Sequence, residues 1–110
     1  MAKRIDENKA MPFLRSMNSF DLIVKEISEI RHRKNIDYGS AFLKFYDDFG
    51  MMGVLCDLGR KYGRIQNFAK GKELRVSDET IEDTLKDMAI ISLNAVYWLR
   101  NKRKKLEASE

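Results

Sequence analysis

The chain has 110 residues and a mass of 12.9 kDa, which is the size of one domain. One proline and six glycines disfavour a fold of many strands and turns, and one cysteine excludes an internal disulfide. No apolar run reaches the roughly 18 residues of a membrane span, and the first ten residues lack the apolar stretch of a signal peptide. We therefore expect a reducing, cytoplasmic location and no membrane partner.

The net charge of +4 belongs to the two ends of the chain. Residues 1–17 carry +2 and residues 100–110 carry +3, whereas residues 18–99 carry −1. A face that binds duplex nucleic acid needs a continuous basic patch, which this near-neutral body does not offer. Nucleic acid is therefore not the expected partner, and contact through the basic ends alone is the weaker alternative.

Hydrophobic spacing of three and four residues predicts four helices and no strands. Residues 1–17 are interpreted as an N-terminal arm. The first helix is expected to begin after Asn18 or Ser19, both good capping residues, and to run to about Lys34. The residues at 35–39, which include Asn, Asp and Gly, predict a turn after it.

The second and third helices are expected to meet at Gly50. Aromatic residues between Phe42 and Phe49 follow helical spacing, and Gly50 is a typical C-terminal stop. The third helix should run from Met51 or Met52 to about Ala69, before a polar loop. Three glycines within it each cost about 1 kcal/mol relative to alanine, so either a neighbouring helix or a ligand should approach its backbone closely. They are Gly53, Gly59 and Gly63.

The fourth helix is expected to begin after Ser77 and to continue to about Arg103. Its stretch from Met88 to Leu99 is apolar on nearly every face, so it should be enclosed. Three partner helices can hardly cover every face, so we predict a small all-α bundle that is a dimer or a higher homo-oligomer. Residues 18–103 would form the helical domain, and residues 104–110 a basic and polar tail.

Acidic residues on two of these helices form the first candidate site. Glu79, Asp83 and Asp87 recur at every fourth position and lie along one side of the fourth helix, and Asn94 continues nearly the same line. Glu26 and Glu29 are three residues apart on the first helix. Their oxygen atoms would suit Mg²⁺ or Mn²⁺. The alternative is a pair of ordinary solvated faces.

Cationic and amide residues form the second candidate site. Lys61, Arg64 and Asn67 are spaced by three residues on the third helix, and the half-buried position expected for Lys61 requires an anionic partner. A bound phosphate and a carboxylate of the chain are equally good partners for Lys61. In the turn, Asn35, Asp37 and Tyr38 could contact a nucleotide base or sugar, or simply cap and turn the backbone.

Three segments of the chain resemble the nucleotide modification associated domain family, a small helical family found largely in phages and bacteria. The segments, which lie within roughly residues 31–99, are HRKNIDYGSAF, GVLCDLGRKYGRIQNF and VSDETIEDTLKDMAIISLNAVYWL. The acidic helix pair is more distantly similar to MazG-like all-α nucleoside triphosphate pyrophosphohydrolases, which hold Mg²⁺ with E-x-x-E and E-x-x-D motifs. Glu26 and Glu29 match the first motif. Asp87 matches the end of the second, but Thr84 stands where that motif begins with Glu.

Two functions follow from these residues and this resemblance. In the first, Mg²⁺ held by four carboxylates binds a (deoxy)nucleoside triphosphate, and a polarised water attacks the α-phosphorus and releases pyrophosphate. The proposed metal ligands are Glu26, Glu29, Asp83 and Asp87, the proposed catalytic residues are Glu79, Asp83 and Asp87, and the proposed nucleotide contacts are Asn35, Asp37, Tyr38, Lys61, Arg64 and Asn67. In the second, the same pocket binds and sequesters a nucleotide without turnover.

Overall fold

The fold is entirely helical over the residues that the computed structural model describes, which are 18–38, 41–72 and 80–109. Four helices and no strand occur in these ranges, which confirms the predicted fold class. They are α3 (Ser19–Tyr38), α4 (Ala41–Phe49), α5 (Met51–Ala69) and α6 (Ile81–Ser109). Among these helices, none is long and apolar enough to cross a membrane.

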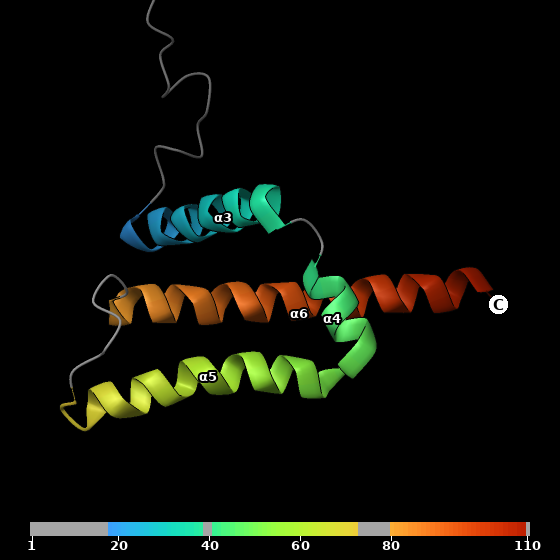
Figure 1. Ribbon diagram of the computed structural model, residues 1–110. Helices are drawn as coiled ribbons and strands as arrows, with labels where there is room; N and C mark the ends of the chain where they lie inside the picture. The colour runs from blue at the N-terminus through green and yellow to red at the C-terminus, as the bar shows by residue number, and fades with distance from the viewer. Residues whose placement is uncertain (1–17, 39–40, 73–79, 110) are drawn as a thin grey trace, which may run out of the picture.

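Helix α6 is the element around which the others are arranged (Figure 1). It contains 29 residues and contacts all three of the other described helices. α3 lies along one side of α6 and runs in the same direction, whereas α5 lies along the other side and runs antiparallel to it. The short α4 crosses both α5 and α6. Residues of α6 can therefore bridge side chains that arrive from both flanking helices.

The start of α6 differs from the prediction, because the helix begins at Ile81 rather than directly after Ser77. Thr80 is the capping residue. Its Oγ1 accepts a hydrogen bond from the backbone N–H of Asp83 at 3.1 Å, and the Asp83 carboxylate accepts one from the backbone N–H of Thr80 at 3.1 Å. This reciprocal pair satisfies two donors that a helix end leaves open. Asp83 is thus a capping partner in the first turn, and Glu79 lies outside the described residues.

Two predicted helix ends are wrong in the same direction. α3 continues past Lys34 to Tyr38, through most of the turn predicted at 35–39. Asn and Asp cost less than about 1 kcal/mol each in a helix interior, which is too little to end a helix by itself. α6 likewise runs through the predicted tail at 104–110 as far as Ser109, since its Lys, Leu, Glu and Ala residues are good helix formers.

Two glycines shape the corner between α4 and α5. Gly50 has a φ of 62°, a conformation that glycine adopts without strain, and its N–H donates to the Tyr46 carbonyl at 2.7 Å. This confirms Gly50 as the stop signal. A Cβ at Gly53 would lie 3.1 Å from the ring of Phe45 and 3.3 Å from that of Tyr46. The close approach expected at Gly53 is therefore made by a neighbouring helix rather than by a ligand.

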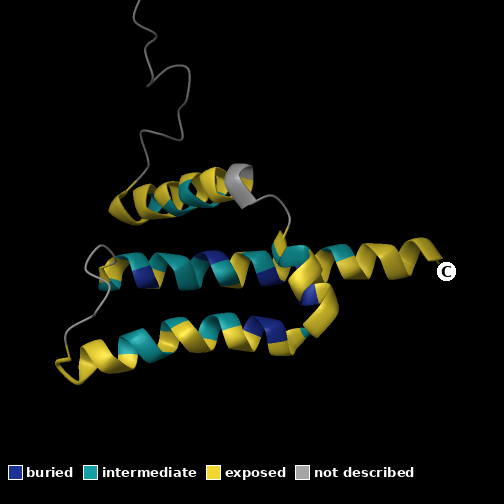
Figure 2. Cartoon of the chain, in the orientation of Figure 1, coloured by how far each residue is buried: buried dark blue, intermediate teal, exposed yellow. Residues whose placement is uncertain are grey.

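The hydrophobic core lies where α4 crosses α5 and α6 (Figure 2). Its buried members are Tyr46, Val54, Ala95 and Trp98. The Tyr46 and Trp98 rings meet edge to face with their centroids 5.8 Å apart, a favourable aromatic arrangement. Only five hydrophobic side chains are buried among the described residues, so much of the apolar surface of the three long helices is open.

Two hydrogen bonds from aromatic side chains hold α4 to its neighbours. The Tyr46 hydroxyl donates to Asp57 of α5 at 2.9 Å, and the indole N–H of Trp98 of α6 donates to Asp47 at 2.9 Å. Burial and the hydrogen bond to Asp57 raise the pKa of Tyr46 well above its ordinary value, so the hydroxyl remains a donor. Buried aromatic groups with a polar atom require such partners.

The Tyr46 hydrogen bond gives a direct test of the packing of α4. Tyr46→Phe removes one hydroxyl and leaves Asp57 with Arg60, whose Nη2 lies 2.6 Å away. We expect the free energy of unfolding, measured by urea denaturation, to fall by about 1 kcal/mol. Tyr97→Phe is the matched control, because Tyr97 is 48% exposed and the substitution, which keeps the ring, should change stability by less than about 0.5 kcal/mol. Equal effects of the two substitutions would contradict this packing.

Candidate functional site

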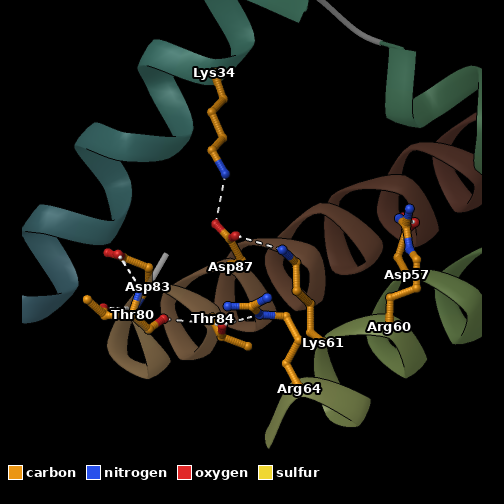
Figure 3. A network of polar contacts seen from close by, with 9 residues as sticks. All are labelled: Lys34, Asp57, Arg60, Lys61, Arg64, Thr80, Asp83, Thr84 and Asp87. Atoms are coloured by element: carbon orange, nitrogen blue, oxygen red, sulfur yellow. Dashed lines mark hydrogen bonds and ion pairs between the residues drawn. The ribbon is translucent and has the colours of Figure 1, made fainter. Parts of the chain in front are cut away.

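Asp87, which is near the middle of the N-terminal half of α6, is the meeting point of three helices (Figure 3). Lys34 of α3 donates from Nζ to Asp87 Oδ1 at 2.7 Å, and Lys61 of α5 donates from Nζ to Asp87 Oδ2 at 3.0 Å. The side chain of Asp87 is 20% exposed, and that of Lys61 is 23% exposed. Lys61 is thus half-buried, as predicted, and of the two partners expected for it the structure shows a carboxylate.

The electrostatic environment keeps Asp87 ionised. Partial burial raises the pKa of its carboxyl group, but the hydrogen bonds from Lys34 and Lys61 outweigh burial and hold the pKa below its ordinary value of 3.8. A carboxylate that accepts from two ammonium groups is a charge-assisted contact, which is stronger than a neutral hydrogen bond. Asp87 is therefore ionised at neutral pH and forms ion pairs with Lys34 and Lys61.

A second polar contact joins α5 to α6 next to Asp87. Arg64 donates from Nε to the Thr84 hydroxyl at 3.1 Å, and that hydroxyl lies 3.3 Å from the carbonyl oxygen of Thr80. Thr84 is completely buried. Figure 3 shows Arg64 and Lys61 side by side on α5, both directed towards α6. The two cations predicted to act together therefore share one side of α5.

A cavity of about 170 Å³ adjoins this cluster between α3, α4 and α6. Its walls include Arg31, Lys34 and Asn35 of α3, Phe42 of α4, and Ile90 and Asn94 of α6. Lys34 belongs both to the wall of the cavity and to the Asp87 cluster. The cavity therefore combines two cations, two amides and an aromatic ring.

Arg31 is the residue of this cavity whose surroundings are most informative. Its Nε donates to Asn94 Oδ1 at 3.0 Å, and its guanidinium carbon lies 5.8 Å from the centre of the Tyr97 ring. Both partners are neutral, and no carboxylate pairs with Arg31 in the described part of the chain. An arginine offers five donors in a planar fork that matches phosphate or carboxylate geometry. A half-buried Arg31 beside an open cavity is therefore suited to an anionic ligand.

The four predicted metal ligands do not gather at one point. Asp83 caps α6, and hydrogen bonds from Thr80 lower the pKa of its carboxyl group. Glu26 accepts a hydrogen bond from Lys86 at 2.6 Å, which raises the pKa of that lysine. Glu29 is exposed and lies 4.0 Å from Lys25. Within the described ranges no group of three or more His, Cys, Asp or Glu side chains is placed to hold a metal ion.

The remaining predicted nucleotide contacts divide into three groups. Asn35 lines the cavity, and its contact with a nucleotide stays a prediction. Asn67 is exposed near the end of α5. The side chains of Asp37 and Tyr38, and the whole of Glu79, lie outside what the structure describes. Lys61 and Arg64 are thus half-buried in the contact between α5 and α6, whereas Asn35, at the cavity, and Asn67 are both exposed.

Two residues of the site were not singled out from the sequence. Arg31 belongs to a run of basic residues in which nothing distinguishes it from Arg33, and its partner Asn94 is 63 positions away. Thr84 was noted only as a departure from an acidic motif. The sequence signal that could have identified Thr84 is its spacing, since Thr84, Asp87 and Asn94 share one side of α6.

Comparison with known proteins found no match to a family model, to a curated protein or to a solved structure.

The lowered pKa of Asp87 predicts a specific acid sensitivity. Because this pKa lies below its value in the unfolded chain, the ionised group stabilises the fold above about pH 4, and this contribution is lost as the pH falls through the folded-state value. We expect the free energy of unfolding to fall between about pH 6 and about pH 3, and to fall less in Asp87→Asn. Urea denaturation at each pH measures this free energy of unfolding.

Asp48→Asn is the control for this experiment. It removes one carboxylate of α4 whose side chain is 51% exposed and which pairs only with Lys44 among the described residues. We expect it to retain the pH dependence of the wild-type protein. If Asp87→Asn also retained the full dependence, Asp87 would not be the paired carboxylate described above.

Proposed function

We propose that the protein binds a nucleotide, whose phosphate groups sit against Arg31 and Lys34 in the cavity between α3, α4 and α6. The observation that carries this proposal is the half-buried Arg31, whose described partners are neutral and which faces that cavity. A phosphate would supply the negative charge and the paired oxygen acceptors that a guanidinium group binds best. Lys34, already held at the cavity by Asp87, adds a second ammonium donor.

The rest of the cavity supports a nucleotide rather than a bare phosphate ion. Asn35 and Asn94 present amides, which can donate to and accept from base edges or sugar hydroxyls, and Phe42 presents a ring. The volume of about 170 Å³ is below the roughly 300–1,000 Å³ of sites that enclose a whole ligand. We infer that one part of the nucleotide is enclosed while the rest extends over the surface. The sequence resemblance to nucleotide-associated families favours the same ligand class.

Binding without a metal ion fits the charges better than binding through Mg²⁺. Asp87 accepts from two lysines, and Glu26 accepts from Lys86, so a metal at either carboxylate would have to displace an ammonium group. The arrangement is suited to holding an anion. The sequestering hypothesis is therefore our proposal, and pyrophosphohydrolysis with Mg²⁺ is the competing outcome that the assay below detects.

Arg31→Gln is the variant that tests the proposed contact. We expect isothermal titration calorimetry to detect binding of at least one (deoxy)nucleoside triphosphate in the presence of EDTA. A charged hydrogen bond contributes roughly 1.5–3 kcal/mol, so Arg31→Gln should weaken this binding by about 10-fold or more. Arg33→Gln is the matched control, because it removes the same charge from an exposed position of the same helix and should change affinity little.

Three results would contradict the proposal. They are the absence of binding to every nucleotide tested, equal losses in the two arginine variants, and binding that appears only with Mg²⁺. Incubation with each nucleotide and Mg²⁺, followed by chromatography of the products, tests hydrolysis separately. Release of pyrophosphate that is lost in Asp87→Asn would favour the enzyme instead of the sequestering protein.

A further inference from the structure

Helices α5 and α6 carry exposed apolar side chains at positions that directly follow residues turned towards a neighbouring helix. On α5 these pairs are Val54 with Leu55, and Lys61 with Tyr62. On α6 they are Thr84 with Leu85, Ala95 with Val96, and Trp98 with Leu99. Successive residues of a helix point about 100° apart. Each exposed side chain therefore lies about a quarter turn away from the contact between the two helices.

This rotation places the exposed apolar side chains of α5 and those of α6 on the same side of the molecule. α5 and α6 are antiparallel neighbours (Figure 1). The same sense of rotation away from their contact therefore leads to one shared face. Helix α4 lies on the opposite face. Gly53, which precedes Val54, packs against Phe45 of α4, and Asp57 bonds to Tyr46 of α4. No described element of this chain covers the face that carries Leu55 and Val96, both of which are exposed.

The spacing on this face is that of helices that pack against other helices. Its exposed positions are Met51, Leu55 and Tyr62 on α5, and Leu85, Ser92, Val96 and Leu99 on α6. The half-buried Leu58, which packs against the core, and the half-buried Ile65 and Ala89 complete the two series. Both series alternate steps of four and three residues, which is the pattern of left-handed helix packing with a crossing angle of about 20°. All ten residues are uncharged, and interface centres are typically depleted of charge.

The exposed area matches what a stable interface requires. Six large apolar side chains on this face are between 43% and 60% exposed, namely Met51, Leu55, Tyr62, Leu85, Val96 and Leu99. At roughly 100 Å² each, they offer about 600 Å². This is the lower end of the roughly 600–1,000 Å² that each partner contributes to a standard protein–protein interface.

We propose that a second copy of this chain covers this face, and that the two α5–α6 pairs form a symmetric four-helix bundle. A two-fold dimer places the same patch against itself, and an uncharged patch with matching helical spacing on two antiparallel helices can do so without like-charge repulsion. Small residues also permit close approach, since a Cβ at Gly59 would meet nothing within 4 Å in the described part of the chain. The other flank of α6 remains available for the nucleotide cavity.

Sedimentation equilibrium of the full chain tests the proposal. We expect wild-type protein to sediment at twice the chain mass of 12.9 kDa at micromolar concentration. Leu55→Glu and Val96→Glu should each shift it to the monomer mass, because each places a carboxylate in the apolar interface from a different helix. Leu22→Glu is the matched control, since Leu22 is 56% exposed on α3 and should leave the dimer intact.

Folding of each variant is checked by circular dichroism and by the fluorescence of Trp98, which is the only tryptophan of the chain and lies in the core. Because Leu55 and Val96 are exposed in one chain, both variants should keep the wild-type helicity. If one variant does not fold, the other tests the same face. A wild-type monomer at all concentrations up to about 100 µM, or a dimer that both folded glutamate variants retain, would overturn the proposal.

Discussion

The carboxylate of Asp87 accepts hydrogen bonds from lysines of two helices that lie on opposite sides of α6. Since α3 buries few apolar side chains, polar contacts with α6 carry much of its attachment. Besides Lys34, Arg31 reaches Asn94 and Glu26 reaches Lys86. Arg31 and Lys34 also line the cavity, so the position of α3 and the proposed binding site depend on the same charged groups.

The faces of α6 have different roles in this account. One holds the core with α4 and α5, and another carries the polar side chains that meet α3. The third is apolar and faces away from α4, which is where we propose the second copy. In the proposed dimer, the almost uniformly apolar segment from Met88 to Leu99 would make two kinds of helix contact, one within the chain and one between chains. The ligand cavity and the proposed dimer face use separate surfaces, so each can be altered independently.

The sequence predicted the helices and part of the site, because both rest on local spacing. Asp87 and Asn94 were expected on one side of α6, and a carboxylate was one of two partners expected for Lys61. Pairing between distant segments was not predictable. Nothing local indicates that Arg31 rather than Arg33 turns inward. Helix ends were missed where Asn and Asp suggested a turn, since their small cost in a helix does not outweigh neighbours that favour it.

The shared Asp87 carboxylate is the central claim, and NMR titration of the Asp side-chain carboxyl groups tests it most directly. In the wild-type protein the Asp87 resonance should titrate below the ordinary range of an aspartate pKa. Lys34→Ala and Lys61→Ala should each raise that pKa, because each removes one of the two ammonium donors. An Asp87 that titrates at its ordinary value and does not respond to either substitution would contradict the convergence of the three helices on this residue.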